Sequence, residues 1–352
     1  MKVSIITPIY NAQEHIERSI KSVINQSYKN IELILINDGS TDNTENICRV
    51  YEEKDTRVTL LNIKNLGPGY ARNKGMELAN GDYISFVDAD DYLHNNAIET
   101  LISKALESDY DVVTGSYFIV KDEIVASKDN YGNRELNKFD TEEGQKHYNS
   151  FKTSSSFGYV WGKVYKRLFL EENNIRFSKD RKVFLEDTLF NLKLFARNPK
   201  YYVLSTPTYY YNIIDDSLSN KSEDITDSAI KLIEDYEKFL DNEELYYENF
   251  DLFISLAART ISYSLYKTMD YQFSLKNIYK KVKKFSNNST VQRLFSNNNS
   301  IKYLKDLDCK LQILLYSFII ISIRYKLEIL LSLVFYIFYP FFKVYINKVL
   351  KS

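Results

Sequence analysis

The first 120 residues alternate short apolar runs with segments of helical periodicity, and this alternation restricts the fold more than any other feature. Apolar, β-branched runs occur at 3–7, 32–36, 58–63 and 83–87. Between the first two runs, apolar residues recur at helical spacing, as in Ala12, Ile16, Ile20, Val23 and Ile24. Helices are also expected near 42–53, 70–79 and 95–108. Strands separated by helices of this length predict βαβ units and a mostly parallel sheet, so the expected class is α/β.

Polar residues follow each of the four predicted strands. The strand ends read TPIYN at 7–11, NDGS at 37–40, NLGPG at 65–69 and DADD at 88–91. In open α/β sheets, ligands bind in the crevice outside the carboxyl ends of the strands. Taken alone, NDGSTD is more simply explained as a turn that caps the next helix. Four such segments together favour a binding site.

The segment YISFVDADDYL at 83–93 places three carboxylates within four positions after a predicted buried strand. Two like charges ~4 Å apart repel by about 4 kcal/mol at an effective dielectric constant of roughly 20, so the cluster needs compensation. Mg²⁺ and Mn²⁺ prefer one or two carboxylates together with phosphate oxygens of a substrate. Asp88 and Asp90 would project to the same side if the strand pairing continued that far.

Several other kinds of site find no support in the sequence. It contains no GxxxxGK[ST] motif, and GPGYAR is not the GxGxxG fingerprint, so neither a P-loop nor a dinucleotide site is indicated. The two cysteines and three histidines form no metal or disulfide spacing; they are Cys48, Cys309, His15, His94 and His147. The run in MKVSIITPIY is too short for a signal peptide, so a reducing, cytoplasmic location is expected.

The segments TPIYN, NDGSTD, NLGPGYARNKG and YISFVDADD, in this order and spacing, resemble those of the family-2 glycosyltransferases of the GT-A fold. The resemblance implies a nucleotide-diphospho-sugar transferase fold, with a mostly parallel sheet flanked by helices. Beyond residue 220 the resemblance fades, and the residues themselves indicate a helical C-terminal region. The implied division is a GT-A domain at 1–220, with a nucleotide-binding half at 1–115 and an acceptor-side half at 116–220. A helical extension at 221–300 and an apolar, basic tail at 301–352 would follow.

The resemblance also implies roles for particular residues of the N-terminal half. Nucleotide contacts would come from Thr7, Tyr10, Asp38, Arg72 and Asp88. Thr7 and Tyr10 would lie on the nucleobase, and Asp38 would bond its polar edge, usually uracil. Asp90 would bind the Mn²⁺ or Mg²⁺ ion that bridges the diphosphate. Without the resemblance, Arg72 is equally well read as an exposed arginine on a helix.

VWGKVYKRLFLEENNIRF at 160–177 and FLEDTLFNLKLF at 184–195 resemble the acceptor-side segment of the family. They contain Trp161, the only tryptophan, together with Lys163 and the pair Glu186 and Asp187. These residues are expected at the substrate, with Asp187 as the base that takes the proton of the acceptor hydroxyl. Without the resemblance, Asp187 is an acidic residue in a helix's first turn, and Trp161 is a core residue. A later segment also resembles the family, with Tyr209, Tyr210 and Tyr211 followed by Ser217 and Ser219. At Asn212, however, relatives often carry Arg or His.

The C-terminal part of the chain is basic and aromatic, although the overall charge is −1. Residues 276–352 carry 14 Lys and Arg but only three acidic residues, a local charge of +11, and five of the lysines fall in Lys276 to Lys284. Uncharged apolar runs of 13 and 14 residues extend from Leu311 to Ile323 and from Ile329 to Phe342. Each is shorter than the ~18 to 20 residues that span a bilayer. The positive charge indicates an anionic partner, either a membrane surface or nucleic acid. The two apolar runs fit helices that lie in a membrane interface, and they therefore favour the membrane. Two helices packed on each other or on a partner chain are the alternative.

The observations and the resemblance together predict a metal-dependent glycosyltransferase on the inner face of the cell membrane, and the resemblance implies that the reaction is inverting. Its donor would be a nucleotide-diphosphate sugar, expected to be a UDP-sugar. Its acceptor would be a hydroxyl of a cell-surface glycan precursor, expected to be lipid-linked. No nucleic-acid partner is expected, and oligomerisation is left open. The alternatives are a sugar-1-phosphate nucleotidyltransferase, which would need a Gly/Arg/Lys-rich N-terminal loop that TPIYNAQEH does not provide, and a non-catalytic membrane adaptor.

Overall fold

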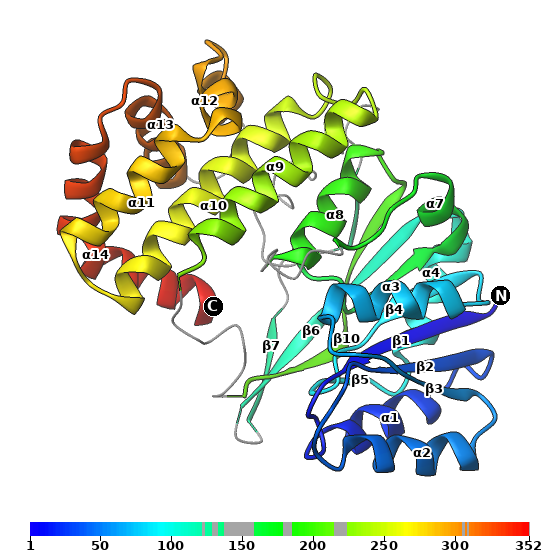
Figure 1. Ribbon diagram of the computed structural model, residues 1–352. Helices are drawn as coiled ribbons and strands as arrows, with labels where there is room; N and C mark the ends of the chain where they lie inside the picture. Colours follow the sequence, from blue (N-terminus) through cyan, green and yellow to red (C-terminus); the bar gives the residue numbers. More distant parts are fainter. Residues whose placement is uncertain are drawn as a thin grey trace. The chain divides into compact units, whose positions relative to one another are not determined.

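The computed structural model describes residues 1–121, 124–128, 133–136, 158–178, 185–214, 224–304, 307 and 310–351. The chain divides into two compact units (Figure 1). The first contains 1–151, 155–181 and 186–215, and the second contains 216–352 with two short segments, 152–154 and 182–185.

The first unit is built on a mixed β-sheet whose N-terminal half is parallel (Figure 1). Its strand order is β3-β2-β1-β4-β9-β6-β10-β5, with β7 paired to β6 and β8 to β10. The parallel half consists of β1 (Val3–Ile9), β2 (Ile31–Asn37), β3 (Val58–Asn62) and β4 (Tyr83–Phe86). The predicted α/β fold with a mostly parallel sheet is confirmed here.

Antiparallel pairs join the rest of the sheet to this half. β9 (Lys163–Lys166) pairs antiparallel with both β4 and β6. β6 and β10 run parallel to each other. The remaining strands are β5 (Tyr92–Leu93), β6 (Val112–Lys121), β7 (Ile124–Lys128), β8 (Arg134–Leu136) and β10 (Tyr201–Asn212). The insertion of β9 between β4 and β6 brings residues 163–166 beside the predicted acidic strand end.

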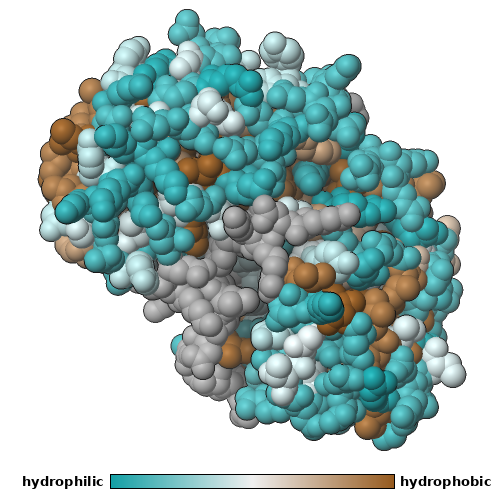
Figure 2. Space-filling model, in the orientation of Figure 1, coloured by the Kyte–Doolittle hydropathy of each residue, from teal (hydrophilic) through white to brown (hydrophobic). Residues whose placement is uncertain are grey.

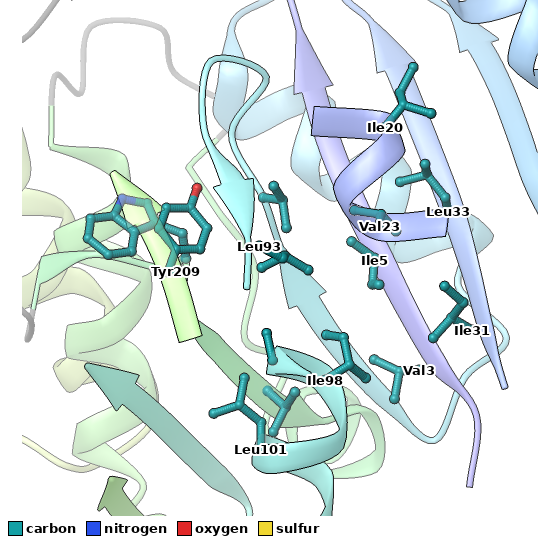
Figure 3. Packing of buried hydrophobic residues seen from close by; sticks show 14 of the residues in the cluster. Val3, Ile5, Ile20, Val23, Ile31, Leu33, Leu93, Ile98, Leu101 and Tyr209 are labelled. Carbon is teal, nitrogen blue, oxygen red and sulfur yellow. The ribbon is translucent and has the colours of Figure 1, made fainter. Parts of the chain in front are cut away.

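The two faces of the sheet receive alternate side chains of each strand. Val3 and Ile5 of β1 lie in one cluster with Ile20 of α1 and Leu101 of α4 (Figure 3). This face is covered by α1 (Ile16–Ile24), α2 (Thr44–Lys54) and α4 (Ala97–Glu107).

The opposite face carries α3 (Pro68–Leu78), and aromatic residues near α7 (Arg167–Glu172) and α8 (Glu186–Ala196) pack beneath it. Gly75 lets α3 approach β1 closely, because a Cβ there would lie 2.3 Å from Cγ2 of Ile6. Phe86, Phe177 and Phe190 pack with ring centroids 4.2 to 5.9 Å apart. These contacts bring the beginning of α8 to the end of β4, and they therefore position the site.

The second unit is helical. Its helices are α9 (Thr226–Asn242), α10 (Phe250–Tyr271), α11 (Leu275–Asn287), α12 (Ser289–Ser296), α13 (Lys310–Arg324) and α14 (Glu328–Lys351), with a 3₁₀ turn, η2 (Lys302–Leu304). α10 is buried on nearly all sides, as expected of the central helix of a bundle. α9 and the helices after it confirm the expected helical C-terminal region.

The two apolar runs of the tail form α13 and α14, which pack within this helical unit. Ile319, Ile320 and Phe335 of these runs are at most 1% exposed, so they are not available to a membrane in this arrangement. Ile321 and Phe338 are 37% and 48% exposed. No helix in the described part of the chain combines the length and apolar character required to cross a membrane.

The lysine cluster of α11 is partly neutralised inside the same unit. Lys281 pairs with Asp224 and Lys284 pairs with Asp227. Farther along the chain, Lys343 pairs with Asp270 at 2.9 Å. The positive charge available to an external partner is therefore smaller than the sequence count suggests.

Candidate active site

Three loops at the carboxyl ends of β1, β2 and β3 are joined by side-chain hydrogen bonds. The backbone N–H of Asn11 donates to Oγ of Ser40 at 3.0 Å, and Oδ1 of Asn11 accepts from the Thr41 N–H at 2.8 Å. Asp38 accepts from the backbone N–H groups of Leu66 and Gly67 at 2.7 and 2.8 Å. The strand ends predicted to line one crevice are therefore adjacent.

The predicted nucleobase contacts differ in their surroundings. Thr7 is 1% exposed, and its Oγ1 has no hydrogen-bond partner among the described residues. Tyr10 is 51% exposed, so its ring is accessible for stacking. Both carboxylate oxygens of Asp38 accept a backbone amide, so this residue also fixes the loop that begins α3. Each oxygen retains a second lone pair with which a ligand could still be bound.

Asp88, Asp90 and Asp91 lie in a turn after β4 and not on an extended strand. The pairing with β1 ends with the bond from the Val87 N–H to the Ile6 carbonyl, and the Asp91 N–H then donates to the Asp88 carbonyl at 3.1 Å. The strand pairing does not continue to Asp88 and Asp90, so the condition under which strand geometry would place them on one side is not met. The chain turns here because β5 begins at Tyr92 and pairs antiparallel with β10.

Asp90, the predicted metal ligand, lies in an electrostatically unfavourable position. Burial and the neighbouring Asp88 carboxylate raise its pKa to about 6. None of the described residues forms an ion pair with its carboxylate. In the described part of the chain, no three Asp, Glu, His or Cys side chains are arranged to enclose a metal ion. The arrangement fits a divalent cation that is held by one carboxylate and completed by substrate phosphate oxygens.

Arg72 lies at the centre of a buried charge network and not on the surface. Its Nη2 is 2.8 Å from Oδ1 of Asp88, and its Nη1 is 3.0 Å from Oε1 of Glu186 and 2.8 Å from Oδ1 of Asp187. The Arg72 side chain is 5% exposed. Burial alone would lower its pKa, but the three carboxylates outweigh this effect and raise it. Arg72 could therefore act on a nucleotide through Asp88, which it positions.

Glu186 and Asp187 occupy the first turn of α8, where the helix dipole favours acidic residues. Burial raises the pKa of Asp187 well above its usual range, and it outweighs the opposing effect of Arg72. The pKa of Glu186 is also raised, again mainly by burial. A carboxylate whose pKa is raised toward neutrality has the property required of a general base.

Lys163 of β9 is buried beneath this network. It is 1% exposed, and burial lowers its pKa to about 7, against the attraction of Asp187. Lys163 and Tyr165 alternate with Val164 along the strand, and Val164 belongs to the core of the other sheet face. Lys163 therefore lies on the α8 side of the sheet, near Asp187.

Trp161 belongs to a stack of aromatic rings. Its ring centroid lies 4.5 Å from Tyr159 and 4.5 Å from Tyr209, nearly parallel to both, and Tyr117 meets it edge-on at 5.0 Å. The residue is 5% exposed. This environment supports the core role that the sequence left open, and it leaves little ring surface for a sugar.

The structure also identifies two residues near the acidic turn to which the sequence assigned no role. Oη of Tyr209 donates to Oδ2 of Asp91 at 2.8 Å, and it accepts from the Asp88 N–H at 3.1 Å. The guanidinium of Arg18 lies 4.3 Å from the ring centroid of Tyr92 and donates to the Asp90 carbonyl at 3.2 Å. The tyrosine triplet was a signal for the first contact. His147, Ser217, Ser219 and Cys309 lie outside the described residues.

Comparison with known proteins finds a family model that resembles part of this chain, and several curated glycosyltransferases similar to it. Residues 4–170 match the model of glycosyl transferase family 2. The chain is 31% identical over 223 residues to glycosyltransferase GlyA of Streptococcus pneumoniae, an alignment that covers 62% of this chain and 31% of GlyA. It is 33% identical over 219 residues to the uncharacterized glycosyltransferase EpsJ of Bacillus subtilis, covering 62% of each chain. The chain thus spans less than two thirds of the length of these curated relatives.

A solved structure resembles the chain over nearly its full length. The crystal structure of S. aureus TarS 1-349 in complex with UDP-GlcNAc superimposes with a TM-score of 0.69 at 20% identity, covering 93% of this chain and 90% of that one. This likeness establishes the fold. The GT-A architecture predicted from the sequence motifs is therefore confirmed.

Proposed function

We propose that the chain transfers a sugar from a nucleotide diphosphate to an acceptor hydroxyl, because residues 4–170 match the model of glycosyl transferase family 2. The observation that carries the proposal is the acidic turn at 88–91. It lies at the carboxyl end of β4, and its Asp90 carboxylate has a pKa raised by burial and by Asp88, with no ion-pair partner among the described residues. A cation that arrives with phosphate oxygens would compensate these two carboxylates.

The donor in this proposal is a UDP-sugar. Tyr10 would stack on the base, Thr7 would bond it, and Asp38 would fix the adjoining loop. The UDP-GlcNAc complex of the TarS structure supports this nucleotide. Asp90, together with the donor diphosphate, would hold Mn²⁺ or Mg²⁺, which when bound would neutralise charge on the departing diphosphate.

The transfer would proceed as a single in-line displacement with inversion. Asp187 would take the proton of the acceptor hydroxyl while its oxygen forms a bond to the anomeric carbon. The bond from that carbon to the diphosphate breaks, and the electron pair leaves with the diphosphate. Arg72 would keep Asp187 and Asp88 in place, because it contacts both at 2.8 Å.

The acceptor in this proposal is a hydroxyl of a lipid-linked glycan precursor at an anionic membrane surface. Several large apolar side chains of α13 and α14 are more than half exposed: Leu311 (51%), Leu314 (68%), Ile329 (66%), Ile337 (60%) and Phe341 (71%). Figure 2 shows hydrophobic surface at the left margin, where Figure 1 labels these helices. From Lys310 onward, the sequence has six Lys and Arg and one acidic residue, Glu328. This combination favours an interfacial position on anionic lipid.

The experiment that tests the proposed function is a thermal-shift screen of nucleoside diphosphates and their sugars, each with Mn²⁺, with Mg²⁺ and with excess chelator. A ligand at a hundred times its Kd stabilises the fold by about 2.7 kcal/mol, which is readily measured. We expect a uridine nucleotide to stabilise the protein only when the metal is present. Absence of any nucleotide effect would contradict the proposal.

A further inference from the structure

The turn that carries Asp88 and Asp90 is held by hydrogen bonds to a residue of β10. Packing of the aromatic ring alone would not require these hydrogen bonds. Tyr209 is fully buried, and its hydroxyl bridges the two ends of the turn. The oxygen accepts from the Asp88 N–H at 3.1 Å and donates to Oδ2 of Asp91 at 2.8 Å. The other oxygen of Asp91 accepts from the Asn212 N–H at 2.7 Å.

Tyr209 is itself fixed in place by its neighbours. Its ring stacks on Trp161 at 4.5 Å, and its backbone pairs with Leu93 just after the turn. Gly162 precedes β9 with a φ of 66°, and a Cβ there would lie 3.5 Å from Cβ of Tyr209. The tyrosine hydroxyl is thus presented from a rigid strand and cannot readily follow a displacement of the turn.

The hydrogen bonds from α1 to the turn are longer than those from Tyr209. Ser19 Oγ lies 3.4 Å from the Asp88 carbonyl, and Arg18 Nη2 lies 3.2 Å from the Asp90 carbonyl. Asp91 is 1% exposed, and a buried acceptor that loses its donor is left with an uncompensated desolvation cost. Without the Tyr209 hydroxyl, the Asp91 carboxylate would lose this donor, and we expect the turn to move in response.

We propose that Tyr209 is a positioning residue that fixes the turn at 88–91, so that Asp90 is presented to a divalent cation bound with a nucleotide diphosphate. The proposal rests on the proposed function, because it assigns the cation and the diphosphate to this turn. It adds a role for a residue that touches neither the donor nor the acceptor. It also gives Asp91 a purpose, as the anchor that the tyrosine holds.

The test compares Tyr209→Phe with the unmodified chain and with Tyr210→Phe. Phenylalanine retains the ring that stacks on Trp161 and removes only the hydroxyl. Tyr210 is the adjacent residue of β10 and stacks on Tyr92 at 4.5 Å, but its hydroxyl makes no contact with the turn, so it is the matched control. Two quantities are measured: hydrogen exchange of the backbone amides of 87–93 without ligands, and the Mn²⁺ concentration that half-saturates UDP binding in calorimetry.

For Tyr209→Phe, we expect faster exchange at 87–93 and at least a tenfold higher Mn²⁺ requirement, with UDP binding restored at high Mn²⁺. Tyr210→Phe should match the unmodified chain in both measurements. Unchanged exchange and an unchanged Mn²⁺ requirement in Tyr209→Phe would overturn the positioning role alone. Failure of the unmodified chain to bind UDP with Mn²⁺ would instead refute the proposed function, and the positioning role with it.

Discussion

Arg72 and Asp187 are 115 positions apart in sequence, yet Nη1 of the first lies 2.8 Å from Oδ1 of the second. The contact joins α3, which follows the third strand, to the first turn of α8. Two further carboxylates, from Asp88 and Glu186, share the same guanidinium. One buried cation therefore connects the predicted donor side of the site to the predicted base.

Replacing Arg72 by methionine should strongly destabilise the fold. Three buried or half-buried carboxylates would lose their common cation, and breaking a buried pair in this way costs about 3–5 kcal/mol. The free energy of unfolding from urea titration measures the loss. Arg49→Met is the control, because its pair with Glu45 is exposed and such pairs contribute about 0.3–0.5 kcal/mol. Similar losses in the two variants would show that the network around Arg72 is not important for stability.

Asp187→Asn should reduce turnover and preserve donor binding. The amide cannot accept the proton of the acceptor hydroxyl, and loss of a general base costs about 10²–10⁴-fold in rate. Kd for UDP, measured with Mn²⁺, should stay within about threefold. Glu186→Gln is the neighbouring control, since it removes another carboxylate from Arg72 but leaves the base. Parallel losses of turnover and UDP affinity in Asp187→Asn would point to a structural role.

Lys163→Met should stabilise the protein more at pH 6 than at pH 10. The folded pKa is about 7, below the ordinary value of about 10.4, so between these values the unfolded chain binds more protons at this position. The contribution of Lys163 to the free energy of unfolding therefore rises with pH in that window. Below pH 7 the buried lysine is charged, and it destabilises the fold most.

The measurement is the free energy of unfolding of both chains at pH 6, 8 and 10. For Lys163→Met, we expect the free energy of unfolding to be higher by an amount on the order of 1–3 kcal/mol at pH 6, with the lost attraction to Asp187 included. This gain should shrink as the pH rises. Lys166→Met on the same strand removes an exposed pair with Asp109 and should change stability by less than about 1 kcal/mol throughout. A difference for Lys163→Met that does not vary with pH would disprove this account of the lysine.

The exposed apolar residues of α13 and α14 should determine binding to anionic vesicles. Leu314→Glu combined with Phe341→Glu removes two apolar anchors, and burial of each such side chain contributes about 1.5–3 kcal/mol, so the bound fraction at low salt should fall at least tenfold. The control is Leu106→Glu with Leu168→Glu in the first unit, where these residues are 46% and 54% exposed. Co-sedimentation measures binding. If the chain instead dimerises without lipid, and the α13/α14 variant abolishes the dimer, the surface belongs to a second copy.

Local patterns predicted the first half of the fold well, because each of its elements is encoded by a short stretch. The apolar run at 83–87 became β4, and the helical spacing after Ala12 became α1. The insertion of β9 between β4 and β6 was not predictable in this way, because it depends on pairing between residues about 80 positions apart. The same limit applies to the turn at 88–91, whose shape depends on Tyr209.

Residue type and position also predicted which side chains gather at the site, but not their partners. Arg72 could be read as a surface arginine, because nothing near it in sequence reveals the carboxylates of Glu186 and Asp187. The lysines of α11 were counted as free charges, since their acidic partners lie 57 positions away. Charge and spacing are visible in a sequence, whereas burial and pairing depend on the fold.

The most direct test of the central claim is the release of UDP from UDP-sugars by the purified chain, measured with Mn²⁺ and again with excess chelator. Asp90→Asn is assayed beside the unmodified protein, and circular dichroism verifies that both are folded. The account predicts that at least one UDP-sugar yields UDP with Mn²⁺, that chelation abolishes the release, and that Asp90→Asn lowers it at least a hundredfold. Release that is equally fast in chelator, or in Asp90→Asn, would contradict the claim of a metal-dependent transferase centred on this turn.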